Sequence, residues 1–266
     1  MAAGRAGARA AAPSAADETG GLWKLALAAA AGAAVAVAVG VAVRRRQRAA
    51  RLARVLARID AVNAEDPTLV SDEGLARPAE VVYGERMSAC LEAFARRRAV
   101  PDEVRIAVRA QHVARFKKPR STFPEGKVGY LAWRRAMYAF HGEIASQLML
   151  AEGYDAVSAE RVRTLLSKDG IKGKDGSRCP DTQLLEDVIC LVFLRYYWKP
   201  FSARKDVSTD EAKAIGILQK TWAKMSAAGH AAALEIPLPE ADKAFIVKAL
   251  SAPKVLLSTD SSAVEE

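Results

Sequence analysis

The sequence has few residues that could cross-link a fold. It contains three cysteines, Cys90, Cys179 and Cys190, and none of them belongs to a CxxC pair. Three isolated cysteines in a chain of 266 residues exclude a disulfide framework. They fit a reducing compartment, and we expect each to be a small buried apolar residue or an inert surface thiol.

Strand patterns are absent as well. No stretch shows the sustained alternation of apolar and polar residues that a half-buried strand requires, and the sequence contains no internal repeat. Helix signals occur throughout instead. We therefore predict an all-α fold, and the roughly 200 residues that follow the N-terminal segment suit a single globular domain.

Acidic residues are scarce only near the N-terminus. Residues 1–60 carry ten basic and three acidic side chains, whereas residues 61–266 carry 30 and 28, so the net charge of +9 divides into +7 and +2. The nearly neutral domain lacks a basic stripe that could replace counterions on a phosphate backbone, so no nucleic acid is expected as a partner. Basic residues beside an apolar segment are attracted to anionic lipids instead.

The N-terminal segment contains the longest apolar run. Residues 22–43 include a single charge, Lys24, and about 20 apolar residues suffice to cross a membrane, so we predict a transmembrane anchor. The arginines of residues 44–48 place the C-terminal domain on the cytoplasmic or matrix side. The alternative is a targeting presequence with Arg5 and Arg9, whose removal would leave a soluble organellar protein.

Proline, glycine and capping residues mark the predicted segments. The chain divides into a disordered N-terminus (1–21), the anchor or targeting segment (22–43), a basic juxtamembrane helix (44–66), an all-α globular domain (67–250) and a disordered tail (251–266). Within the domain we predict helices that begin at Pro78, cover 102–118, 128–152, 158–168, 181–198 and 208–229, and begin again at Pro239, with an exposed, mobile connection over 169–180.

Two acidic residues interrupt the apolar helix predicted over 181–198. Glu186 and Asp187 lie there, and Asp187 has Leu184 and Leu191 one turn away on either side. An unpaired buried carboxylate would cost several kcal/mol or would become protonated. We therefore expect Asp187 to have a partner, which would be an arginine, a histidine or a metal ion.

Histidines are as scarce as cysteines, so the search for that partner is short. Of the three histidines, His141 lies on a mostly apolar helical face, and His112 lies between an apolar stripe and a cationic one. Arginine presents a planar fork suited to phosphate or carboxylate, so Arg109, Arg115 and Arg134 are the predicted anion-binding residues. The alternative is a satisfied polar network inside a helical bundle.

Four separated motifs occur in order along the chain: RAQHVARFKKPRSTFPEGKVGYLAWR, FHGE, QLLEDVICLVFLRYY and KTWAKMSAAGHAAAL. Together they resemble the family called domain of unknown function 4202, over roughly residues 58–250. Members of that family are often labelled glutamyl-tRNA synthetase-like.

The synthetase label can be tested against the residues. A class I synthetase needs a Rossmann sheet, a HIGH-type motif and a KMSKS-type loop. Only the segment 224–226, Lys-Met-Ser, is similar to any of these, and it lies in a predicted helix with no strand pattern before it. We therefore reject glutamyl-tRNA synthetase activity and predict that Met225 packs in the core.

The order of the polar residues also resembles the all-α metal-dependent phosphohydrolases of the HD type. Those enzymes use a histidine, a later His-Asp pair and a distal aspartate, and His112, His141 and Asp187 occur in a comparable order. The resemblance implies one divalent metal ion, held by these three residues, that activates water against a phosphoester. Gly142 stands where the pair needs its aspartate, so Glu186 would have to supply the missing carboxylate.

Two functions of different classes follow. The first is a membrane-tethered hydrolase or anion-binding enzyme that acts on a phosphorylated small molecule. Its catalytic residues would be Glu186 and Asp187, and its substrate-binding residues would be Arg109, Arg115 and Arg134. The second is a non-catalytic helical scaffold, or a subunit of a membrane complex, in which the same residues form a buried polar network.

Overall fold

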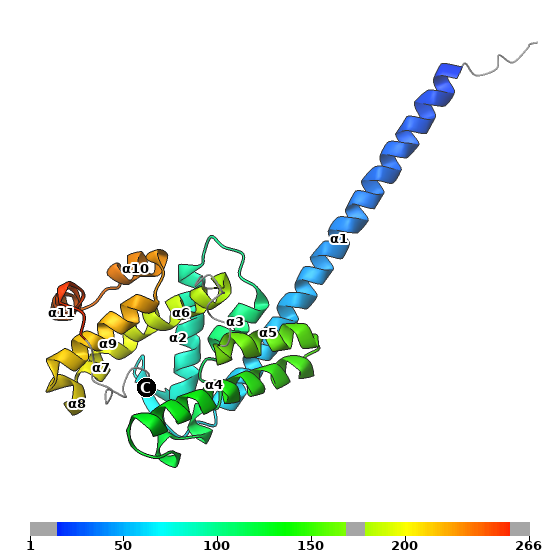
Figure 1. The fold of residues 1–266 in the computed structure, drawn as a ribbon. Coiled ribbons are helices and arrows are strands. Elements are labelled where there is room, and N and C mark those ends of the chain that lie inside the picture. The colour runs from blue at the N-terminus through cyan, green and yellow to red at the C-terminus, as the bar shows by residue number, and fades with distance from the viewer. Residues whose placement is uncertain (1–14, 169–178, 256–266) are drawn as a thin grey trace, which may run out of the picture. The chain divides into compact units, whose positions relative to one another are not determined.

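The computed structural model describes residues 15–168 and 179–255 of the chain (Figure 1). The predictions of disorder over 1–14 and 256–266, and of a mobile connection over 169–178, lie outside these residues. By its internal contacts the chain divides into two compact units, residues 1–50 and 51–266.

The described part of the first unit is helical. Helix α1 (Ala15–Asn63) begins there, in a sequence rich in alanine, which has the highest helix propensity of all residues. Residues 41–50, which include the arginine block, are exposed. In the described part of the chain, no helix combines the length and the apolar character that a membrane span needs. Most side chains of the predicted anchor, 22–43, lie outside that part.

The second unit is a helical domain, in agreement with the predicted fold class. After the end of α1 its elements are, in order, β1 (Leu69–Asp72), β2 (Leu75–Pro78), α2 (Ala79–Phe94), α3 (Asp102–Arg109), the 3-10 turns η1 (Arg115–Lys117) and η2 (Arg120–Thr122), α4 (Gly126–Ala151), α5 (Ala156–Ser167), α6 (Pro180–Val192), the π-helical turn η3 (Phe193–Tyr197), α7 (Trp198–Ser202), α8 (Lys205–Ser208), α9 (Glu211–Lys224), α10 (Ala227–Leu234) and α11 (Glu240–Ser251).

The hairpin of β1 and β2 is a feature that the sequence patterns did not predict. Its two antiparallel strands pair Leu69 with Pro78 and Asp72 with Leu75. Glu73 and Gly74 both have positive φ angles, 50° and 81°, which a tight two-residue hairpin turn requires. Each strand has only four residues, so alternation has no length over which to appear.

The helix predicted over 102–118 is much shorter in the structure. Helix α3 ends at Arg109, and Ala114 adopts a left-handed conformation with a φ of 55°. The side-chain oxygen of Asn63 accepts a hydrogen bond of 2.9 Å from the backbone N–H of Ala114, which holds this turn in place. His112 therefore lies in a turn rather than on the face of a long helix.

The helix predicted over 181–198 has three parts. Helix α6 passes into the π-helical turn η3, which passes into α7 at Trp198. A π-helical turn is wider than an α-helical one and is frequent at functional sites. Two residues of η3, Phe193 and Tyr197, line a cavity.

The helix predicted over 208–229 ends early. Helix α9 stops at Lys224, and the hydroxyl of Ser226 caps α10 by accepting a hydrogen bond of 3.1 Å from Gly229. The Lys-Met-Ser segment therefore joins two helices instead of lying within one. Met225 is buried in the core, as predicted.

Two apolar clusters form the core of the second unit. The larger takes side chains from the end of α1 and from α2 to α6, and it includes the fully buried Val55, Ile59 and Met87. The smaller takes side chains from α6, α7, α9 and α11. Each fully buried aliphatic side chain contributes about 1.5–3 kcal/mol of transfer free energy. Helix α6 contributes to both clusters, which explains why it is buried along most of its length.

Gly129, in the first turn of α4, tests how tightly the loop before this helix packs. A Cβ atom at Gly129 would overlap the carbonyl oxygen of Pro124. We expect Gly129→Ala to lower the free energy of unfolding by about 1–3 kcal/mol, because the backbone would have to shift. Denaturant unfolding measures the loss, with Val128→Ala as control because the Val128 side chain is 83% exposed. Equal stability of the two variants would contradict this packing.

Candidate functional site

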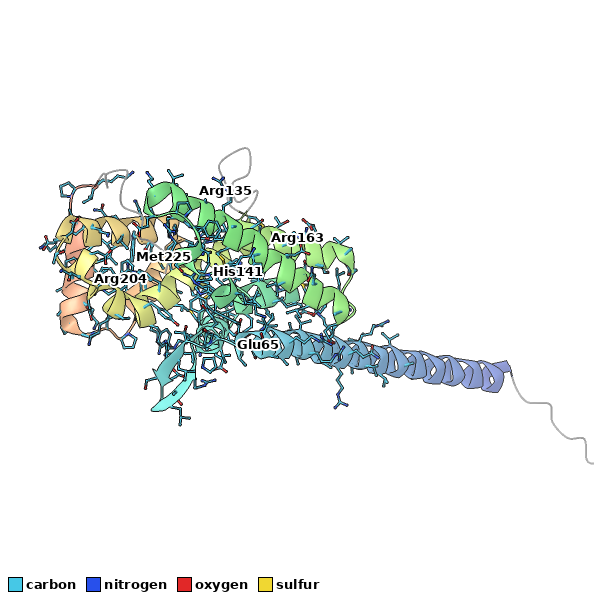
Figure 2. All side chains as sticks on the ribbon, turned by 90° about the horizontal axis from the view of Figure 1, so that it is seen from below. Glu65, Arg135, His141, Arg163, Arg204 and Met225 are labelled. Carbon is cyan, nitrogen blue, oxygen red and sulfur yellow. The ribbon has the colours of Figure 1, made fainter. Side chains whose placement is uncertain are left out.

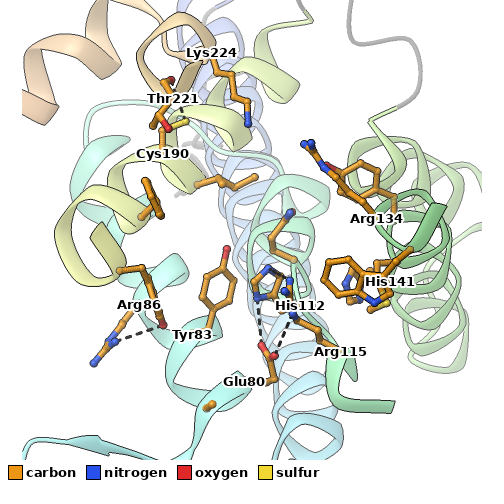
Figure 3. A pocket seen from close by; sticks show the side chains of 18 of the residues that line it. Glu80, Tyr83, Arg86, His112, Arg115, Arg134, His141, Cys190, Thr221 and Lys224 are labelled. Atoms are coloured by element: carbon orange, nitrogen blue, oxygen red, sulfur yellow. Dashed lines mark hydrogen bonds and ion pairs between the residues drawn. The ribbon is translucent and has the colours of Figure 1, made fainter. Parts of the chain in front are cut away.

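A cavity of about 210 Å³ lies within the second unit (Figure 3). Its wall comes from α2, the turn after α3, α4, α6 with η3, and α9. Aromatic and ionisable side chains dominate it. The ionisable ones, apart from tyrosines and Cys190, are Glu80, Arg86, His112, Arg115, Arg134, His141 and Lys224.

Glu80, His112 and Arg115 form one connected group. Nδ1 of His112 lies 3.3 Å from a carboxyl oxygen of Glu80, and Nε2 of His112 lies 3.2 Å from a guanidinium nitrogen of Arg115. A guanidinium can only donate, so Nε2 is the acceptor. In neutral His112 the proton is therefore on Nδ1, directed at Glu80. Nε of Arg115 is also 3.9 Å from Glu80.

The pKa of Glu80 is raised to about 8. Burial is the main cause, because it disfavours the charged carboxylate. The charge of Arg115 opposes the rise, and the charge of Asp66 adds to it. Asp66 also fixes the position of Glu80, since its side chain accepts a hydrogen bond of 3.2 Å from the Glu80 backbone N–H. Glu80 is thus a protonated acid at neutral pH.

His141 lies inside the domain, on α4 (Figure 2), with 3% of its surface exposed. Its Nδ1 is 2.8 Å from the carbonyl oxygen of Val113, which can only accept, so Nδ1 carries a proton. Burial lowers the pKa of His141 to about 3, and the nearby His112 adds to this effect. The ring is therefore neutral, and its Nε2 is a hydrogen-bond acceptor.

Aromatic rings support the charged groups of the wall. Tyr83 stacks on His112, with 3.9 Å between the ring centroids and an angle of 10° between the planes. The guanidinium of Arg115 lies 4.8 Å from the centre of the Trp133 ring. These contacts restrict the motion of both polar side chains.

Arg86 reaches the cavity from α2 and is paired on its other side. It donates a hydrogen bond of 2.8 Å to Asp72 of the hairpin, and its guanidinium lies 4.6 Å from the centre of the Tyr196 ring. The hairpin that the sequence patterns did not predict therefore helps to orient one of the cations of the cavity.

Four of the predicted site residues meet in this cavity: His112, His141, Arg115 and Arg134. The ring centroids of the two histidines are 6.1 Å apart. Arg109 does not line the cavity. Its guanidinium makes two hydrogen bonds, of 2.6 and 2.7 Å, to the carboxylate of Asp60 on α1.

Glu186 and Asp187 do not line the cavity either. Glu186 forms an ion pair of 2.8 Å with Lys168, and both side chains are buried. Asp187 accepts hydrogen bonds from the backbone N–H and the hydroxyl of Ser226, at 2.7 and 2.6 Å, and from Gln183 at 3.1 Å. Within the described residues, Asp187 therefore has a helix-capping serine and a glutamine as partners, where an arginine, a histidine or a metal ion was predicted.

No three His, Cys, Asp or Glu side chains in the described part of the chain are grouped so that they could hold a metal ion. The divalent metal ion and the catalytic roles assigned to Glu186 and Asp187 stay predictions.

Several residues of the wall were not predicted as site residues: Glu80, Tyr83, Arg86, Gln111, Trp133 and Lys224. Glu80 lies in the first turn of a helix, where the helix dipole stabilises a charged carboxylate. The sequence alone therefore suggests an ordinary surface acid. Gln111 could have been noticed, because it precedes His112 directly.

Asp187 allows a direct test of a structural role. We expect Asp187→Ala to lower the free energy of unfolding by about 1–3 kcal/mol, because the donors of Ser226 would lose their buried acceptor. Denaturant unfolding checks this. The control is Asp181→Ala, on the same helix, whose ion pair with Arg161 is at the surface and should contribute less than about 1 kcal/mol. Unchanged stability in Asp187→Ala would contradict the capping role.

The family comparison agrees with the resemblance seen in the motifs. A family model described as a domain of unknown function (DUF4202) matches residues 53–246, a range that includes every described residue of the cavity wall. The match carries no synthetase activity with it. No curated protein and no solved structure matches the chain. The chain belongs to the domain of unknown function 4202 family.

Proposed function

We propose that this chain is a phosphate-binding helical protein whose cavity takes a small phosphorylated molecule. The main support is the charge of the cavity wall. The described wall residues include four Lys and Arg side chains and one carboxyl group. That carboxyl, Glu80, is neutral near pH 7 because its pKa is raised to about 8. A group with two negative charges is the matching ligand.

The orientation of Arg115 supports phosphate in particular. Its guanidinium donates to His112 and packs on Trp133, so its planar fork is held before any ligand arrives. A fork of this kind matches two oxygens of a phosphate group. Little side-chain entropy is then lost on binding, which favours affinity.

Cations from two different helices support the same ligand. Arg134 extends from α4 and Lys224 from α9, and both point toward the cavity (Figure 3). A phosphate between them would be contacted from more than one side. Phosphate has several acceptor oxygens, and a small carboxylate offers fewer.

The anion-binding part of the first predicted function fits the cavity better than metal-dependent hydrolysis or a purely structural network does. In a purely structural network, buried polar groups are usually satisfied within the protein. This wall brings four Lys and Arg side chains together around open space. Metal-dependent hydrolysis would additionally need a metal ion, whereas phosphate binding needs only the arginines and the lysine.

Arg115 provides the first test. We expect Arg115→Met to weaken the binding of ethyl phosphate by about tenfold or more, because a charge-assisted hydrogen bond contributes about 1.5–3 kcal/mol. Isothermal titration calorimetry of the full chain measures the affinity. Arg97→Met is the matched control, because Arg97 is exposed and is not part of the wall. Equal affinity of the two variants, or no binding by the unaltered chain, would refute the proposal.

Glu80 provides a second test through pH. Below about pH 8 its carboxyl is neutral, and above that pH it becomes a carboxylate that opposes an anionic ligand. A phosphate monoester is already dianionic above about pH 7. We therefore expect affinity for ethyl phosphate to fall as pH rises from 7 to 9.5, and to stay nearly constant in Glu80→Gln.

Stability gives an independent readout of the same group. The pKa of Glu80 is about 8 in the folded protein and 4.5 in the unfolded reference, so between these pH values only the folded state holds the proton. Its contribution to stability is complete below pH 4.5 and is lost as pH rises to about 8. Glu80→Gln should remove this slope, and Glu125→Gln, at an exposed site, should keep it. A slope that persists in Glu80→Gln would contradict the raised pKa.

A further inference from the structure

The side-chain carbonyl of Gln111 in the cavity wall cannot form a hydrogen bond with a phosphate dianion. The side chain of Gln111 is 5% exposed, and it lines the cavity. Its carbonyl oxygen Oε1 is buried and accepts no hydrogen bond. A buried acceptor without a donor is costly and rare in folded proteins. Phosphate cannot satisfy it, because a phosphate dianion offers only acceptors.

His141 adds a second acceptor to the same wall. Its Nδ1 proton is committed to the Val113 carbonyl, and the pKa of about 3 keeps the ring neutral, so Nε2 can only accept. The wall therefore has two kinds of chemistry. Its cations attract an anionic group, and Gln111 and His141 provide acceptors for hydrogen-bond donors.

The size of the cavity limits the ligand. The cavity volume of about 210 Å³ is below the roughly 300–1,000 Å³ of pockets that take drug-sized ligands. One face of the Tyr83 ring is covered by His112, and one face of the Trp133 ring is covered by Arg115. The small volume disfavours a ligand with a large planar base.

We infer that the cavity binds a phosphorylated polyol of sugar size, with its phosphate at the arginines and its hydroxyls donating to Gln111 Oε1 and His141 Nε2. The inference rests on the proposed function and names its ligand class. Hydroxyl groups supply the donors that the two acceptors require. A site built to bind a hydroxyl group discriminates strongly against an analogue that lacks it, because the buried acceptor then stays unpaired.

The experiment compares two phosphate monoesters by isothermal titration calorimetry with the full chain. Ribose 5-phosphate carries hydroxyls and ethyl phosphate carries none. We expect the unaltered chain to bind ribose 5-phosphate about tenfold or more tightly than ethyl phosphate. In Gln111→Leu this preference should fall several-fold, through lost affinity for ribose 5-phosphate. Gln147→Leu is the matched control, because Gln147 is exposed on α4 and outside the wall, and it should keep the full preference.

The melting temperature of the ligand-free protein gives a second readout. If Oε1 of Gln111 forms a hydrogen bond only with a ligand, Gln111→Leu removes a buried unpaired acceptor. The substitution should then raise the melting temperature by about 2 °C or more. A lower melting temperature would mean that the amide serves the fold instead, and would overturn the inference.

The other outcomes separate the inference from the proposed function. Equal affinity of the unaltered chain for both esters refutes the polyol and leaves phosphate binding standing. Binding of neither ester refutes the proposed function itself. Tighter binding of adenosine monophosphate than of ribose 5-phosphate would indicate a site that binds a nucleobase. That result would also overturn the inference.

Discussion

The buried amide of Asn63 joins the segments on which the cavity depends. Its nitrogen donates to the backbone carbonyl of Glu80 at the start of α2, and its oxygen accepts from Ala114 in the turn after α3. The side chain is 1% exposed, so water does not compete for these bonds. Because the two segments share one amide, the acid of the cavity and the turn that carries His112 are positioned together.

The electrostatics of the wall follow from that arrangement. A carboxyl placed in water beside several cations would ionise and neutralise part of their charge. Burial at the start of α2 reverses this for Glu80, whose pKa rises despite the nearby Arg115. The same surroundings keep His141 neutral. The wall thus keeps its positive charge on arginine and lysine, while its acid and one of its imidazoles act as neutral hydrogen-bonding groups.

Local patterns predicted what depends on neighbours along the chain. The all-α class, most helix starts and the apolar face around His141 follow from helical spacing within one segment. The pairing of Asp187 with Ser226 and of Arg109 with Asp60 could not be predicted, since these partners lie 39 and 49 residues apart in the sequence. Periodicity shows that a face is buried and does not identify the helix packed against it. The end of α3 was missed for the same reason, because a side chain of α1 holds the turn.

The π-helical turn η3 affects how the two apolar clusters can be packed at once. One extra residue in a turn rotates everything after it by about 100°, because an α-helix has 3.6 residues per turn. Before the turn, α6 contributes most of its buried side chains to the larger cluster, and after it Trp198 stacks on Phe245 of α11 in the smaller one. A related chain with one residue fewer here would direct its indole away from that neighbour. Alignment gaps at this point would therefore mark members whose C-terminal helices are arranged differently.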